Sequence, residues 1–171
     1  QALWIPGAPP CVLSTEGGYR SFPISSERDR ALADKLGQQL GYPPVLEDVV
    51  SGRGLSRLAA LLSGGPEVPP ETLSAQALKS PGTARDAVFW FIELLARAAA
   101  DACFSTGARG GVVISGGIVP RFAPLLSDAN FRHHFVRPGP LAPYLGQVPV
   151  RLVTNTTAAL IGAAAAAQLV S

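Results

Sequence analysis

The sequence predicts an α/β domain, and three observations support this. A run of β-branched residues between glycines, Val112 to Ser115, is typical of a central parallel strand, and Val150 to Val153 forms a second such run. Each run is followed by a helical segment. A long block of helical periodicity precedes both runs. The order of strands and helices favours parallel strands joined by right-handed crossovers.

Composition limits the classes of protein to which this chain can belong. The chain has 171 residues, 47% of them apolar and 15% charged, which suits one compact domain. A formal net charge of +2 is too small to indicate binding to nucleic acid or to a membrane surface. Cys11 and Cys103 stand far apart without a Cys/His cluster, so we expect neither a disulfide framework nor a zinc site, and a cytoplasmic location fits best.

The first predicted elements are two strands, Gln1 to Ile5 and Cys11 to Ser14, joined by a turn rich in proline. The chain begins inside a strand-like run without an initiator methionine. We therefore expect it to be a piece of a longer protein.

The next element is a helix capped by Ser25 or Ser26 and ended by Gly41. Its leucines recur every four residues, as one buried helical face requires. They are Leu32, Leu36 and Leu40.

The rest of the helical block has three parts. Residues 45–62 predict two helical pieces hinged at 51–54, and a linker rich in proline and glycine covers 63–70. Helices are then expected over about 72–78 and 83–104, and Gly107 stops the second of them.

The C-terminal part alternates between strands and helices. Gly116 and Gly117 turn the strand at 112–115 into a helix over 119–126. The strand at 150–153 leads through the helix-capping residues 154–157 into an Ala-rich terminal helix. That apolar run is too short to span a bilayer, and we expect a buried helix.

Three ordered segments resemble the bacterial glucokinase family of the sugar kinase and actin superfamily. They are Ser14-Thr-Glu-Gly-Gly-Tyr-Arg-Ser-Phe22, Leu46-Glu-Asp-Val-Val-Ser-Gly-Arg-Gly-Leu55 and Val113-Ile-Ser-Gly-Gly-Ile-Val-Pro-Arg121. The tail from Phe131 to Val150 continues the likeness, so the resemblance covers nearly the whole chain.

The resemblance implies a ribonuclease H-like, actin-like ATPase domain with a helical insertion. Residues 1–171 would be the C-terminal portion of the large domain of a two-domain sugar kinase. The terminal helix, at about 156–170, would dock on the small domain. The family is commonly dimeric, so a homodimer is among the implied states.

The first segment is similar to the family's Glu-Gly-Gly-His motif, whose acid and imidazole bind glucose hydroxyls. Glu16 matches the acid, and Gly17 and Gly18 let the backbone approach a sugar. Tyr19 stands where the family has histidine, and a phenol is neither an acid nor a base at neutral pH. Tyr19 is therefore either a sugar contact or a packed aromatic. An isolated Glu-Gly-Gly is also compatible with a plain surface turn.

Glu47 matches a second sugar-binding acid of the family. A carboxylate accepts hydrogens from two hydroxyls, which suits sugar recognition. The alternative is a solvated acid in the first turn of a helix, where it favours the helix dipole. Asp48, next to Glu47, is expected to face water.

In the superfamily, the turn matched by Ser115, Gly116 and Gly117 touches the adenosine part of ATP. Such a strand-to-helix turn also forms without any ligand. The resemblance implies the cofactors ATP and Mg²⁺, but the family's two phosphate loops and its catalytic Asn-Asp pair do not appear in this chain. We expect no catalytic base and no metal ligand here.

The sequence thus favours a glucokinase that converts glucose and ATP to glucose 6-phosphate, with this chain inactive alone. The alternatives are the sugar-binding domain of a sugar-responsive repressor and a catalytically silent scaffold. The repressors usually carry a cysteine-rich zinc motif, and its absence argues against that class. Neither nucleic acid nor a membrane is an expected partner.

Overall fold

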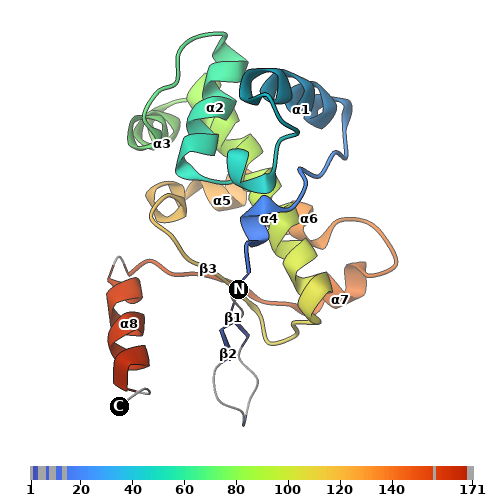
Figure 1. The fold of residues 1–171 in the computed structure, drawn as a ribbon, viewed down its shortest axis with the longest axis vertical. Helices are drawn as coiled ribbons and strands as arrows, with labels where there is room; N and C mark the ends of the chain where they lie inside the picture. The colour runs from blue at the N-terminus through green and yellow to red at the C-terminus, as the bar shows by residue number, and fades with distance from the viewer. Residues whose placement is uncertain (1, 4–6, 8–10, 13–14, 156, 169–171) are drawn as a thin grey trace.

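The computed structural model describes residues 2–3, 7, 11–12, 15–155 and 157–168, and it is mostly helical (Figure 1). Two small sheets accompany the helices. The elements in chain order are β1 (Ala2–Leu3), β2 (Cys11–Val12), the 3-10 helix η1 (Gly17–Tyr19), α1 (Glu27–Leu40), the 3-10 helix η2 (Leu46–Asp48), α2 (Gly52–Ser63), α3 (Pro70–Lys79), α4 (Thr83–Thr106), β3 (Val112–Ile114), the 3-10 helix η3 (Val119–Phe122), α5 (Leu125–Asp128), α6 (Phe131–Val136), α7 (Ala142–Gln147), β4 (Val150–Leu152) and α8 (Ala158–Gln168).

Both strand pairs follow the sequence-based expectation. Strand β1 pairs with β2 in antiparallel fashion, with Leu3 opposite Cys11. Strands β3 and β4 are parallel, and Ile114 lies opposite Leu152. The expected limits Gln1, Ile5 and Ser14 lie outside the described residues.

Helix α1 begins and ends where its capping residues predict. The Ser26 hydroxyl accepts a hydrogen bond from the amide of Asp29, and Gly41 ends the helix with a φ of 76°. A residue with a side chain rarely adopts that φ, whereas glycine adopts it freely. Leu32 and Leu36 are buried on the inner face of the helix.

Helix α2 starts unusually close to η2. The Ser51 hydroxyl caps it by accepting the amide hydrogen of Gly54. A Cβ atom on Gly54 would lie only 2.3 Å from the carbonyl oxygen of Val49. Glycine is therefore required there, and the close approach anchors η2 to the first turn of α2.

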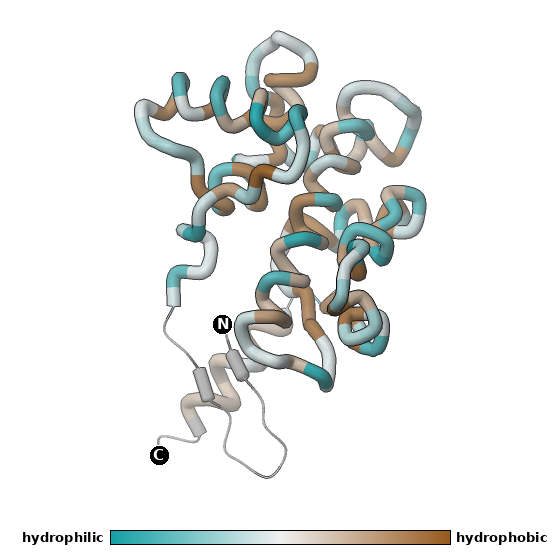
Figure 2. Tube along the Cα trace, turned by 90° about the vertical axis from the view of Figure 1, so that its right-hand side faces the viewer, coloured by the Kyte–Doolittle hydropathy of each residue, from teal (hydrophilic) through white to brown (hydrophobic). Residues whose placement is uncertain are grey.

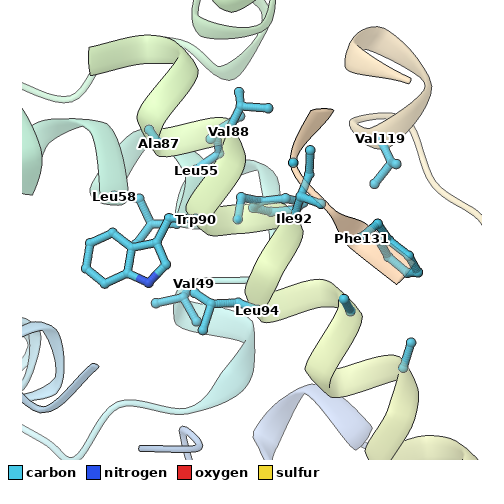
Figure 3. Packing of buried hydrophobic residues seen from close by; sticks show 14 of the residues in the cluster. Val49, Leu55, Leu58, Ala87, Val88, Trp90, Ile92, Leu94, Val119 and Phe131 are labelled. Atoms are coloured by element: carbon cyan, nitrogen blue, oxygen red, sulfur yellow. The ribbon is translucent and has the colours of Figure 1, made fainter. Parts of the chain in front are cut away.

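Helix α4 is the centre of the core. Helices α2, α3 and α6 all pack against it, as Figure 1 shows. In Figure 3, Leu58 lies beside Trp90 on one side of α4, whereas Val119 and Phe131 lie on the opposite side. All these side chains are almost fully buried, so α4 carries apolar residues around most of its circumference.

The helix expected over 119–126 forms in two pieces, η3 and α5. Pro124 immediately precedes α5. Because proline has no amide hydrogen, it interrupts a continuous helix at that point.

Strand β3 is not a buried central strand in this chain, contrary to the sequence-based expectation. Val113 is 61% exposed. Among the described residues, β4 is the only strand paired with β3, so the other edge of β3 is unpaired, and the exposed Val113 marks an uncovered face of this small sheet.

Helix α8 is exposed, which corrects the expectation of a buried helix. The side chains of Leu160 and Ile161 are 73% and 58% exposed. Figures 1 and 2 place α8 at the end of the molecule away from α1, α2 and α3, so these helices do not cover it. In the described part of the chain, no helix combines the length and the hydropathy needed to cross a membrane.

Candidate functional site

Backbone hydrogen bonds join the segments that carry η1 and η2. The amide of Leu46 donates to the carbonyl of Arg20 at 2.9 Å, and the amide of Phe22 donates to the carbonyl of Pro44 at 3.2 Å. Ser21 and Val45 form an isolated antiparallel bridge between these two bonds. The two segments are more than twenty residues apart in sequence, so the fold brings them together.

Gly18 and Glu47 meet at this junction. A Cβ atom on Gly18 would lie 2.8 Å from the Oε2 atom of Glu47 and 3.2 Å from its Cβ atom. Any larger residue at position 18 would therefore push the Glu47 carboxylate away. Gly18 does not adopt a positive φ, so it is this contact with the Glu47 side chain, and not the backbone conformation, that disfavours a larger residue there.

Glu16 and Tyr19 flank the glycine pair and face solvent. The carbonyl of Glu16 accepts the amide hydrogen of Tyr19 at 3.0 Å, which closes the turn of η1. Arg20 donates from Nε to the carbonyl of Gly17 at 3.2 Å and holds the same turn from the other side. The Tyr19 side chain is 69% exposed, so its ring does not pack into the core of this chain.

Asp48 is buried, and the expectation that it faces water is wrong. Its exposed fraction is 6%. Its Oδ1 atom accepts hydrogen bonds from Arg57 at 2.7 Å and from the Tyr42 hydroxyl at 3.1 Å, and its Oδ2 atom accepts from the amide of Val45 at 3.0 Å. A buried carboxylate is costly unless it has such partners.

The Tyr42 hydroxyl is held as a hydrogen-bond donor. Partial burial, the hydrogen bond to Asp48 and the negative charge of Asp48 raise the pKa of Tyr42 above its ordinary value of 10.0. A phenol is already protonated near neutral pH, and the raised pKa means that Asp48 further favours the protonated form that donates to it.

The second candidate group lies at the end of β3. Ser115, Gly116 and Gly117 are exposed there, and Gly116 has a φ of 137°, which favours glycine. Apart from the adjoining residues of the chain, no atom of the described residues lies within 4 Å of the position that a Cβ atom would take on Gly116 or Gly117. Arg121 donates from Nε to the carbonyl of Gly117 at 3.1 Å and steadies the turn.

Sequence reasoning missed the cluster of Asp48, Tyr42 and Arg57. A signal was present, because an acid three residues after the start of a short helix often accepts the amide hydrogen at that start. The partner Arg57 lies nine residues further along the chain. Arg57 reaches Asp48 because the chain turns at Ser51, so the nine-residue separation in sequence does not by itself indicate a contact.

Comparison with known proteins identifies the family. The glucokinase family model matches residues 1–170. A glucokinase from Paramagnetospirillum magneticum is 35% identical over 159 residues, which cover 90% of this chain and 49% of the relative. A glucokinase from Pseudomonas paraeruginosa is 38% identical over 163 residues, covering 92% of this chain and 48% of the relative.

Solved structures agree with this match. The crystal structure of a glucokinase from an Antarctic psychrotroph has a TM-score of 0.79 and 34% identity, and the match covers 92% of this chain and 50% of that one. A glucokinase from Balamuthia mandrillaris, solved with glucose, has a TM-score of 0.77 at 18% identity and covers 90% of this chain and 46% of that one, which supports the fold alone. The expected fold class, part of an actin-like sugar kinase, is thereby confirmed. This chain spans about half the length of the relatives that it matches, and it belongs to the glucokinase family.

Proposed function

We propose that this chain is the sugar- and adenosine-binding portion of an enzyme that phosphorylates glucose with ATP to give glucose 6-phosphate. The observation that carries the proposal is the contact between Gly18 and Glu47, because it joins two segments that both resemble the family's sugar site. The repressor and scaffold alternatives gain no support from relatives that are named as glucokinases.

In this proposal, Glu16 and Glu47 accept hydrogen bonds from sugar hydroxyls. Both side chains are exposed, and they come from segments that backbone hydrogen bonds hold together. Gly17 and Gly18 leave room for the sugar to approach the backbone. A site built from fixed acceptors rejects sugars that lack the matching hydroxyl, since an acceptor is then left unpaired.

The adenosine part of ATP would lie against Ser115, Gly116 and Gly117. Both glycines are exposed and have open space where a Cβ atom would lie, which leaves room for a planar ring system to approach them. ATP supplies the phosphoryl group, and Mg²⁺ neutralises its charge. In the part of the chain that the structure describes, no three His, Cys, Asp or Glu side chains are grouped to hold a metal ion. We propose that the magnesium ligands and the catalytic base belong to the part of the family's length that this chain does not span, because the family's phosphate loops and Asn-Asp pair have no match in this sequence.

Helix α8 has a role in the same proposal. Ala159 and the alanines from Ala163 to Ala167 are exposed together with Leu160 and Ile161, so the described residues leave this apolar helix largely uncovered. Such a surface is unfavourable in water. We propose that α8 docks on the small domain of a complete cytoplasmic enzyme.

An activity assay tests the proposed reaction. The complete polypeptide, with the upstream half of the family's length present, is expected to convert glucose and ATP to glucose 6-phosphate in a coupled assay. This chain alone is expected to show no turnover above buffer, because none of its matched residues can deprotonate the sugar hydroxyl. A complete polypeptide without glucose-dependent turnover would contradict the proposal, as would an active isolated chain.

Tyr19 is expected to influence the choice among hexoses. Its exposed phenol supplies one hydroxyl contact where the family has an imidazole, so Tyr19→His should change the relative kcat/KM for glucose over its epimers. The measurement is kcat/KM for glucose, mannose and galactose in the complete enzyme.

Tyr19→Phe provides the matched variant, because it removes the hydroxyl and keeps the ring. It should alter the same preference if the hydroxyl touches the sugar. If neither variant changes the preference, Tyr19 is not a specificity residue.

A further inference from the structure

We propose that Asp48 is a positioning residue for Glu47, and that it acts through a buried cluster with Arg57 and Tyr42. The inference rests on the proposed function, because it assumes that Glu47 binds the sugar. Asp48 itself is buried and would not touch the substrate. Its role would be to fix the 3-10 helix η2 (Leu46–Asp48) that presents the Glu47 carboxylate.

Both carboxylate oxygens of Asp48 are engaged. The Oδ2 atom accepts the amide hydrogen of Val45, the residue just before η2, so the side chain closes the short helix on itself. The Oδ1 atom accepts from Tyr42 and from Arg57. Because the bonds arrive from separate directions, the carboxylate has one favoured orientation.

Arg57 fixes the backbone of η2 as well. Its NH1 atom donates to the Asp48 carboxylate at 2.7 Å and to the Asp48 carbonyl at 3.2 Å. The two side chains are 11% and 8% exposed, so water screens this ion pair only weakly. Arg57 stands on α2, which packs on the central helix α4, and the cluster therefore ties η2 to the core.

The position of Glu47 depends on this attachment. Glu47 precedes Asp48 directly, and its carboxylate lies against Gly18. Within η2, Glu47 is exposed, Leu46 is half-buried and Asp48 is the buried side chain. Without the cluster, η2 would be held by backbone bonds and by the buried Val49 that follows it, and the Glu47 carboxylate would be less closely fixed beside η1.

The test is the steady-state kinetics of Asp48→Asn in the complete enzyme. This variant keeps the shape of the side chain and removes the charge that pairs with Arg57. We expect KM for glucose to rise about 10-fold because the sugar-binding acid is misplaced, with KM for ATP within about twofold of the wild type. Simple loss of folded enzyme would lower the apparent kcat and leave both KM values unchanged.

Asp29→Asn is the matched control. Asp29 is also a buried acid paired with an arginine, Arg97, but it lies on α1, and its carboxylate accepts hydrogen bonds from Ser25 and Arg97 and not from η2. It should lower stability without changing KM for glucose. If Asp48→Asn does not fold, Tyr42→Phe provides the same test, because Tyr42 is 48% exposed and its loss leaves the ion pair intact. For Tyr42→Phe we expect a rise in KM for glucose of about threefold.

Glu47→Gln, measured in the same assay, separates this inference from the proposed function. If Glu47→Gln leaves KM for glucose unchanged, the sugar-site assignment itself fails. If Glu47→Gln raises KM for glucose but Asp48→Asn and Tyr42→Phe do not, the positioning role is overturned. A rise in KM for glucose with Asp29→Asn equal to that with Asp48→Asn would also overturn it.

Discussion

Replacing Arg97 by methionine is expected to destabilise the protein by about 3–5 kcal/mol, the usual loss when one partner of a buried ion pair is removed. Arg97 donates to both carboxylate oxygens of Asp29, at 2.8 and 3.1 Å. The exposed fractions of the two side chains are 7% and 0%. The variant leaves the Asp29 carboxylate without its counterion in a site that water does not reach.

The loss of stability in Arg97→Met is large because Asp29 is held as an anion. Burial alone would raise the pKa of Asp29, but hydrogen bonds from Ser25 and the charge of Arg97 outweigh burial and hold the pKa below its ordinary value of 3.8. A carboxyl with a lowered pKa stabilises the fold above its unfolded pKa. That contribution is lost as the pH falls below 3.8.

Unfolding in urea measures the effect of Arg97→Met. Glu71→Gln is the control, since Glu71 pairs with Arg121 at 3.8 Å and both side chains are about half exposed. Exposed pairs contribute little, so the control should change the unfolding free energy by less than about 1 kcal/mol. Equal losses for the two variants would mean that the pair of Asp29 and Arg97 does not stabilise the fold as described.

Replacing Glu47 or Glu16 by glutamine is expected to weaken glucose binding by about 1–3 kcal/mol each, which is typical for a hydrogen bond to a charged group. Glutamine keeps the size of the side chain but has one acceptor oxygen instead of two. Both positions are exposed, so the folded state should tolerate the change.

Calorimetric titration of glucose into each variant of the complete enzyme measures this effect. Glu67→Gln serves as the control, because Glu67 is an exposed acid in the linker between α2 and α3. It should bind glucose as the wild type does. Wild-type affinity in both Glu16→Gln and Glu47→Gln would remove these residues from the sugar site.

The long helices α1 and α4 were predictable because local signals determine them. Ser26 and Gly41 mark the two ends of α1, and Gly107 ends α4 with a φ of 65°. The leucine spacing identified the buried face of α1 correctly. These features depend on neighbouring residues, so the sequence pattern contains them.

The candidate site was predictable only in part. The glycine pair and Glu47 carried a family resemblance, but their contact arises from backbone bonds between distant segments. The burial of Asp48 depends on Arg57, which reaches back from the next helix. Local patterns do not contain such long-range contacts.

The exposure of α8 was missed for a different physical reason. An Ala-rich apolar run predicts a buried helix, but burial also requires a neighbouring surface. Among the described residues, Leu160 and Ile161 have no neighbouring surface that covers them. Hydropathy therefore predicts that the apolar surface of a helix becomes buried, but it does not predict which element buries it.

The most direct test of the sugar-binding role is glucose titration into the complete enzyme with Glu16→Gln and Glu47→Gln combined. Two weakened charged hydrogen bonds predict a combined loss of about 2–6 kcal/mol, which lowers the affinity about 30-fold or more. Binding of an ATP analogue should stay within about twofold of the wild type, because its proposed contacts lie at the separate turn of Gly116 and Gly117. Glucose affinity within about twofold of the wild type would contradict the account.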